Sequence, residues 1–104
     1  METGRKRQQG INDLLAEKRE AILQLAEKHG ATNVRVFGSA ARGEATENSD
    51  IDFLVAFEPG YTLWDYIALT QDLEDLIGRR VDVVQERLLR DEIRDDVLAE
   101  AVPL

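Results

Sequence analysis

The chain has 104 residues, of which 43% are hydrophobic and 33% charged, and such proportions are typical of one folded domain. No apolar run approaches the roughly 18 residues that a membrane-spanning helix needs, and the basic N-terminus lacks the apolar segment of a secretory signal. We therefore expect no membrane as a partner. The absence of cysteine excludes disulfides and thiolate metal sites and is compatible with the cytoplasm, which is the expected location.

The net charge is −8, and all of the acidic excess lies in residues 31–104. An acidic surface repels long nucleic acid, so we expect none as a partner. It favours a basic protein or a small ligand that carries a metal, although solubility alone would also explain the charge. Residues 1–10 are predicted to be a flexible tail, and residues 11–104 to form a single domain, because no linker or repeat interrupts them.

Helical and strand-like hydrophobic periods alternate along the chain. Apolar residues three and four apart predict helices, and short apolar runs bounded by Gly, Pro or polar residues predict strands. In chain order the expected elements are a helix at 12–29, a strand at 33–37, a strand at 50–57, a helix at 63–77, a strand at 80–85 and a helix at 91–101.

The first expected helix has Asn12 at a plausible N-cap and Gly30 where a left-handed C-cap belongs. His29, the only histidine, lies in its last turn, either favouring the helix dipole or facing solvent. In the second expected helix, Thr62 and Asp65 form a capping-box-like start. Trp64 is expected on an exposed face, where it packs locally or offers a surface to a partner.

A glycine–serine turn follows the first expected strand. Gly38 interrupts the strand and lets a ligand approach the backbone, and Ser39 stands where the N-cap of a short helical turn belongs. Such a turn presents backbone N–H groups and a partial positive charge, to which phosphate binds. Arg42 could reach the same phosphate or instead pair with Glu44 or Glu47. A Gly-Ser pair alone is usually only a turn.

Two carboxylates open the second expected strand. Asp50 and Asp52 are two residues apart, so both side chains point to the same face. Two carboxylates that close repel each other unless one takes up a proton or a cation binds. Hard oxygen ligands suit Mg²⁺ or Mn²⁺, so we interpret the pair as a metal site. A loop cap or two solvated carboxylates would also give this pattern.

A third carboxylate, Asp82, interrupts the third expected strand. If that strand lies beside the second, Asp82 can join Asp50 and Asp52. A phosphate-binding turn and three carboxylates are the groups that metal-assisted nucleotidyl transfer needs, with one metal on the triphosphate and another on the attacking hydroxyl. In this scheme Asp50 and Asp52 hold both metals, and Asp82 holds the second and could accept the proton.

Gly38-Ser39, ten further residues and then Asp50-x-Asp52 resemble the motif of the DNA polymerase beta nucleotidyltransferase superfamily. Phe37 and the run ARGEATENSDID resemble its minimal branch, the MntA-type antitoxins. Asp82 stands where the third carboxylate of that family is expected. The resemblance covers about residues 12–102 and implies an α/β fold with a small mixed sheet of three to four strands and packed helices.

The resemblance also implies an activity. Similar proteins are antitoxins of HEPN/MNT toxin–antitoxin systems, which transfer AMP from ATP to a tyrosine of the partner HEPN ribonuclease toxin and silence it. This implies ATP as substrate, Mg²⁺ or Mn²⁺ as cofactor and a HEPN-type toxin as partner. The chain is too short for domains that grip a template or a drug, so a protein acceptor is expected. The alternatives are a non-catalytic antitoxin that acts by binding, and nucleotidyl transfer to a small molecule or an RNA end.

Overall fold

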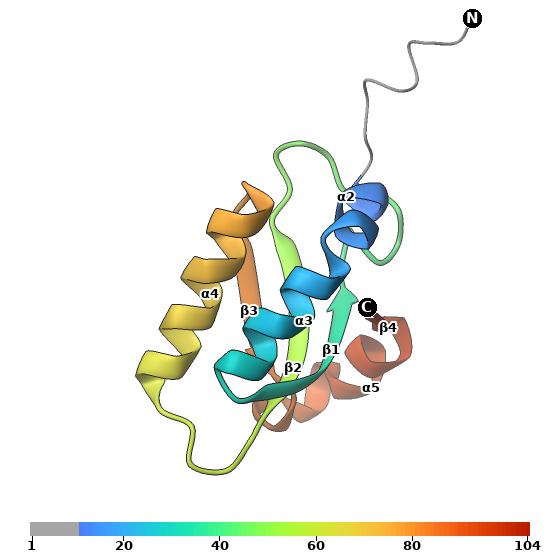
Figure 1. Ribbon diagram of the computed structural model, residues 1–104. Helices are drawn as coiled ribbons and strands as arrows, with labels where there is room; N and C mark the ends of the chain where they lie inside the picture. The colour runs from blue at the N-terminus through green and yellow to red at the C-terminus, as the bar shows by residue number, and fades with distance from the viewer. Residues whose placement is uncertain (1–10) are drawn as a thin grey trace, which may run out of the picture.

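The computed structural model describes residues 11–104 and builds them around one sheet of short strands (Figure 1). In chain order the elements are the helices α2 (Ile11–Glu17) and α3 (Arg19–Lys28), strands β1 (Ala31–Phe37) and β2 (Ile51–Phe57), helix α4 (Leu63–Ile77), strand β3 (Val81–Gln85), the 3₁₀ helix η1 (Glu86–Leu88), helix α5 (Asp91–Glu100) and strand β4 (Val102–Pro103).

The sheet is mixed, as expected, with the strand order β3-β2-β1-β4. Strand β1 runs antiparallel to both β2 and β4, whereas β2 and β3 are parallel. Their connection is α4, a crossover helix of the kind that parallel neighbours require. Because β2 and β3 run parallel, their N-terminal ends, which carry Asp52 and Asp82, lie at the same end of the sheet.

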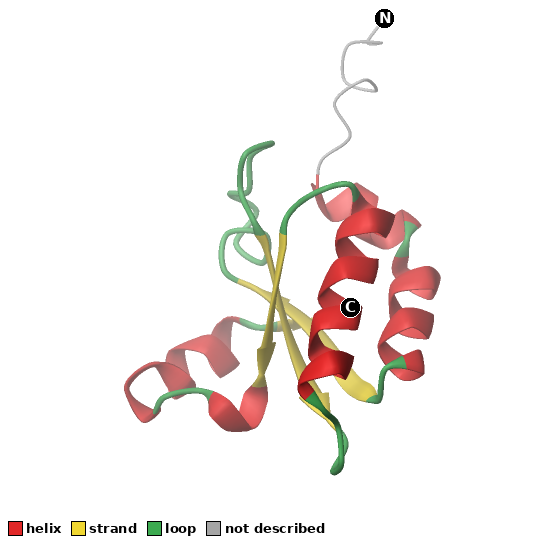
Figure 2. Cartoon of the chain, turned by 90° about the vertical axis from the view of Figure 1, so that its left-hand side faces the viewer, coloured by secondary structure: helices red, strands yellow, loops and turns green. Residues whose placement is uncertain are grey.

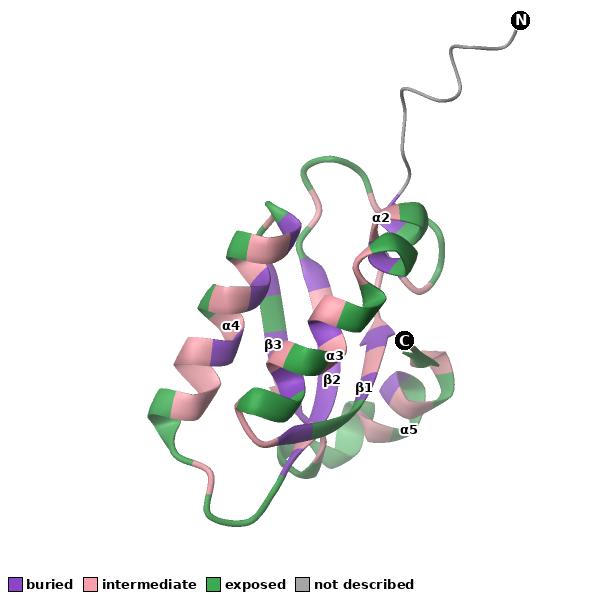
Figure 3. Ribbon diagram, in the orientation of Figure 1, coloured by how far each residue is buried: buried purple, intermediate pink, exposed green. Residues whose placement is uncertain are grey.

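Helices cover both faces of the sheet (Figure 2). On one face α3 and α4 bury the larger core, which includes Phe53 of β2, Ile22 of α3 and Leu69 of α4. On the other face Leu54 packs with Leu89 and Val97, under α5. Both faces of β2 are therefore buried, which confirms it as the central strand (Figure 3). Burial of each such side chain stabilises the fold by roughly 1.5–3 kcal/mol.

The N-terminal helix differs from its prediction. Residues 11–28 form two helices that meet at Lys18, where the backbone opens to φ −100° and ψ 11°. The chain bends there without losing its hydrogen bonds, since the N–H of Lys18 still donates to the carbonyl of Leu14. Asn12 lies within α2, so its prediction as an N-cap was wrong. Gly30 follows α3 with φ 78°, which confirms the left-handed position.

Two parts of the sheet were not predicted in full. Strand β1 begins two residues early, at Ala31, because an irregularity in its pairing with β2 near Asn33 interrupts the alternation of apolar residues. Strand β4 has only two residues, too few for a periodic pattern, and pairs Val102 with Val36. Strands β2 and β3 begin one residue later than predicted, at Ile51 and Val81, and helix α5 ends one residue earlier, at Glu100.

Helix α4 has the predicted bounds, with the capping box of Thr62 and Asp65 at its start and Gly78 in the left-handed conformation at its end. His29 does not face solvent: its Nε2 lies 2.8 Å from Oδ2 of Asp72, so the imidazole links the end of α3 to α4.

Within residues 11–104 no helix is long and apolar enough to cross a membrane. The predicted tail, residues 1–10, lies outside the described residues, and its boundary with the proposed domain stays a prediction.

Candidate active site

The turn after β1 is built around Gly38. The N–H of Arg42 donates to the carbonyl of Gly38 at 3.1 Å, and that of Glu44 to the carbonyl of Ser39 at 2.8 Å, so residues 38–44 form consecutive turns rather than a regular helix. Gly38 has φ 72°, and a Cβ at this position would overlap Oδ2 of Asp52. Only glycine gives the turn this close approach to the carboxylate.

The sheet places the predicted aspartates beside that turn. Phe37, which precedes Gly38, is the antiparallel partner of Asp52, and Asp52 is the parallel partner of Asp82. Neighbouring strands are about 4.8 Å apart, so Gly38, Asp52 and Asp82 follow one another across three adjacent strands. Asp50 lies just before β2 and is exposed. The expected position of the third strand beside the second is thereby confirmed.

Asp52 has the most perturbed environment of the three carboxylates. Burial raises its pKa above the usual range, and the negative charges of Asp82 and Asp50 raise it further, while Arg42 opposes the shift. The dependence on both neighbours shows that the three aspartates interact electrostatically. Among the residues that the structure describes, Arg42 lowers the pKa of Asp52 but does not reverse the shift.

The donor set fits a hard divalent cation, because it consists of carboxylate oxygens whose repulsion a cation would relieve. The side chains are not arranged as a finished cage: within residues 11–104 no three Asp, Glu or His side chains converge on one point. Asp50 is turned outward, with its Oδ1 3.7 Å from Nε of Arg80. A metal role for Asp50, Asp52 and Asp82 therefore stays a prediction.

Sequence reasoning missed Glu100, the last residue of α5. Its Oε1 accepts a hydrogen bond from the N–H of Gly38 at 2.9 Å, and its Oε2 accepts one from Nη1 of Arg42 at 2.6 Å. The Arg42 guanidinium, and then the Gly38 N–H, hold the pKa of Glu100 below its usual range. Arg42 also pairs with Glu44, one of the two partners considered for it, at 2.9 Å. The turn and Arg42 thus bind an anionic group.

Hydrogen bonds hold the loop between the turn and Asp50 in place at the end that precedes Asp50. The Oγ of Ser49 accepts a hydrogen bond from the N–H of Thr46 at 3.0 Å, so Ser49 caps the loop. Arg79 donates to the carbonyls of Thr46 and Ser49, which ties the loop to the start of β3. These bonds hold the backbone next to Asp50.

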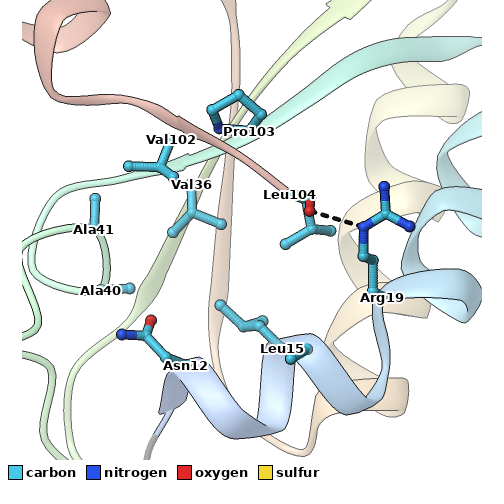
Figure 4. Close-up of a pocket in the computed structure, with 10 residues that line it drawn as sticks. Asn12, Leu15, Arg19, Val36, Ala40, Ala41, Val102, Pro103 and Leu104 are labelled. Carbon is cyan, nitrogen blue, oxygen red and sulfur yellow. Dashed lines mark hydrogen bonds between the residues drawn. The ribbon is translucent and has the colours of Figure 1, made fainter.

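A pocket of about 290 Å³ lies behind the turn (Figure 4). Leu15, Val36 and Val102 give it an apolar lining, and Nε of Arg19 donates to the carbonyl of Leu104 at 2.8 Å across one side. Ala40 belongs to this lining but none of the predicted aspartates does. The pocket is therefore separate from the candidate site.

Replacing Asp52 by Asn is expected to stabilise the metal-free protein at neutral pH. Because folding raises the pKa of Asp52, the folded state binds the proton more tightly than the unfolded chain, and stability falls as pH rises through the raised pKa. The side chain of Asn carries no charge at any of these pH values, so the D52N variant does not lose this stability as the pH rises. The difference in Tm between D52N and the wild type, measured in EDTA, should be near zero in acid and should grow toward pH 7. A lower Tm for D52N at pH 7 would contradict this account.

Comparison with known proteins identifies the class. The nucleotidyltransferase domain family matches residues 18–104, so the chain belongs to that family. The protein adenylyltransferase MntA of Thermococcus cleftensis is 44% identical over 94 residues, which cover 86% of this chain and 95% of that protein. The chain is accordingly a nucleotidyltransferase with the predicted α/β fold.

Solved structures agree with this assignment. One described as a minimal nucleotidyltransferase is 58% identical to this chain, with a TM-score of 0.80 over 86% of this chain and 92% of its own. A toxin–antitoxin complex with AMP-PNP contains a chain that is 23% identical, with a TM-score of 0.70 over 81% of this chain and 69% of its own, and shares the fold.

Proposed function

We propose that the protein transfers AMP from ATP to a tyrosine of a HEPN-type ribonuclease toxin and so acts as its antitoxin. The observation that carries this proposal is the close packing of the Gly38 turn against Asp52, with Asp82 as the next residue across the sheet. The name of the Thermococcus cleftensis relative, protein adenylyltransferase, supports a protein acceptor. The acidic charge of −8 suits a basic partner in the cytoplasm.

The Gly38 turn would bind the triphosphate. The N–H of Gly38 and the guanidinium of Arg42 already bind a carboxylate, and phosphate oxygens present the same kind of acceptor. The hydroxyl of Ser39, the next residue, would donate a further hydrogen bond. Mg²⁺ or Mn²⁺, held by Asp50, Asp52 and Asp82, would when bound neutralise the negative charge that gathers on the phosphates.

The acceptor hydroxyl would approach from the side of β3. Its oxygen forms a bond to the α-phosphorus of ATP, the bond from that phosphorus to the oxygen shared with the β-phosphate breaks, and pyrophosphate leaves. The hydroxyl proton passes to the carboxylate of Asp82, which is exposed and lies on β3, two strands away from β1 and its phosphate-binding turn. The order of the strands thus separates the leaving group from the acceptor.

The test is to incubate the protein with ATP, Mg²⁺ and the product of the neighbouring gene and to follow the mass of that product. We expect a gain of one or more AMP units and loss of ribonuclease activity. The proposal would be wrong if the mass did not change, or if D50N produced the same modification at the same rate.

Glu100 is expected to compete with the nucleotide. Its carboxylate occupies the N–H of Gly38 and the guanidinium of Arg42, both of which the triphosphate would use. Glu100→Gln removes the charge but keeps the shape, so MgATP should bind about threefold to tenfold more tightly, equivalent to roughly 1 kcal/mol. Calorimetric titration measures the change.

The matched control is Glu92→Gln, which removes the same charge from an exposed position in the first turn of α5. It should leave the affinity for MgATP unchanged. Weaker binding by Glu100→Gln would instead mean that Glu100 supports the site by holding Arg42 in place.

A further inference from the structure

Two consecutive arginines precede β3 and contact the loop and the carboxylate on which the proposed metal site depends. Arg79 donates to the carbonyls of Thr46 and Ser49 in the loop. Arg80 lies beside Asp50, with its Nε 3.7 Å from Oδ1 of the carboxylate. One arginine therefore acts on the main chain before Asp50, and the other acts on the carboxylate itself.

The register of the sheet places Arg80 next to Asp50. Ile51 of β2 and Val81 of β3 are parallel partners, so the residues that precede them are neighbours at the same end of the sheet (Figure 1). Because alternate residues of a strand share a face, the side chain of Arg80 projects on the same face as that of Asp82. The arginine therefore lies on the face of the sheet that carries the aspartates.

Arg80 gives Asp50 a counter-charge that the other two aspartates lack. Within residues 11–104, neither Asp52 nor Asp82 forms an ion pair with a basic side chain. Asp50 points toward the guanidinium, and no three acidic side chains of the described residues converge on one point. A carboxylate that the proposed metal site needs is thus paired with a cation that belongs to the protein.

The contact is weak enough for a metal ion to break. A separation of 3.7 Å is too long for a hydrogen bond, and the side chains of Arg80 and Asp50 are 84% and 51% exposed. Solvent screens such a pair, so its attraction is small. A divalent cation attracts a carboxylate more strongly, because it carries twice the charge and bonds directly to the oxygen. It would therefore replace Arg80 as the partner of Asp50.

The main chain around the pair is fixed, so only the two side chains need to turn. The N–H of Ile51 donates to the carbonyl of Arg80 at 3.0 Å, and Arg79 holds the loop that precedes Asp50. A polar pocket of about 300 Å³ is lined by both side chains of the pair and leaves them space to rotate. The exchange of one partner for the other requires no rearrangement of the sheet.

We propose that Arg80 is a positioning residue that pairs with Asp50 in the metal-free protein and releases it when a divalent cation binds. The inference rests on the proposed function, in which Asp50 is a metal ligand. The guanidinium opposes the cation because it draws the carboxylate outward. In the other half of the site, Glu100 occupies the groups that are proposed to bind phosphate. Before MgATP binds, each half is therefore paired with a counter-charge of the protein itself.

Binding of Mn²⁺ alone tests this proposal without any transfer reaction. Arg80→Gln removes the charge, so a calorimetric titration should show about threefold to fivefold tighter binding of Mn²⁺. Arg80→Lys keeps the charge and should behave like the wild type. The control is Arg87→Gln, which removes the same charge from an exposed position in η1, beyond the other end of β3, and should leave the affinity unchanged.

Two results of this titration would overturn the proposal. One is an equal affinity for Mn²⁺ in Arg80→Gln and Arg87→Gln. The other is a failure of both the wild type and Arg80→Gln to bind Mn²⁺ at millimolar concentrations.

A double-mutant cycle tests whether the effect passes through Asp50. In an Asp50→Asn background, Arg80→Gln should change the affinity for Mn²⁺ by less than about twofold, because the carboxylate that it would free is gone. An equal gain in both backgrounds would overturn the pairing, since Arg80 would then only repel the cation. The gain from Arg80→Gln should also shrink in concentrated KCl, which screens exposed charges. A gain that salt left unchanged would mean a structural effect and would likewise overturn the proposal.

The two proposals fail in different ways. If Arg80→Gln tightens Mn²⁺ binding only when Asp50 is present and the partner gains no AMP, Arg80 competes for Asp50 as proposed and the transfer activity is wrong. If the partner gains AMP while Arg80→Gln and the wild type bind Mn²⁺ equally, the transfer activity stands and the role of Arg80 is wrong.

Discussion

Asp52→Asn should reduce AMP transfer at least about a thousandfold. Asp52 is the carboxylate that contacts the Gly38 turn on one side and is paired with Asp82 on the other, so it lies between the proposed phosphate and acceptor positions. An Asn side chain has a similar shape but lacks the charge that would hold a cation. A loss of about 4 kcal/mol in transition-state stabilisation corresponds to this factor. Single-turnover transfer to the partner, at saturating MgATP, measures it.

The control for this variant is Asp75→Asn on the exposed side of α4, which removes one charge far from the turn and should retain full activity. Neutralisation of the partner should be followed in the same samples. If D52N still neutralised it fully without modifying it, the protein would act by binding alone, and AMP transfer would not be its antitoxin mechanism.

The sequence was sufficient to predict those parts of the site whose residues lie close together along the chain. The ten residues between Gly38-Ser39 and Asp50 allow the chain to leave β1 and return along β2, which is why the spacing predicted that turn and carboxylates would meet. The prediction that Asp82 joins the site depended on one further condition, namely that β3 lies next to β2. The apolar run of α4 between them is the crossover helix that makes this the parallel neighbour.

What could not be predicted depends on contacts between distant residues. Glu100 reaches Gly38 because β4, only two residues long, returns along β1 and places the end of α5 over the turn. No periodicity marks so short a strand. The sequence placed His29 near the helix dipole or in solvent and missed its partner, Asp72, because that residue lies on a different helix.

Gly38→Ala is expected to abolish most of the activity at a modest cost in stability. The added Cβ would overlap Oδ2 of Asp52, the mobile end of a side chain, and would also lie 3.3 Å from Cγ, so the carboxylate must turn away. A displacement of about 1 Å at a reacting group can reduce a rate about a hundredfold, which is the loss we expect in the transfer assay. The positive φ adds a strain of roughly 1–2 kcal/mol.

Gly43→Ala separates these two effects, because Gly43 has φ 74°, against 72° for Gly38. A Cβ at Gly43 would have no atom of the described chain within 4 Å, so this variant carries the backbone strain without the overlap. Both variants should therefore show similar decreases in Tm, and only Gly38→Ala should lose transfer activity. Equal activity in the two variants would mean that the approach of Gly38 to Asp52 is a packing feature, and that the turn does not set the position of the carboxylate.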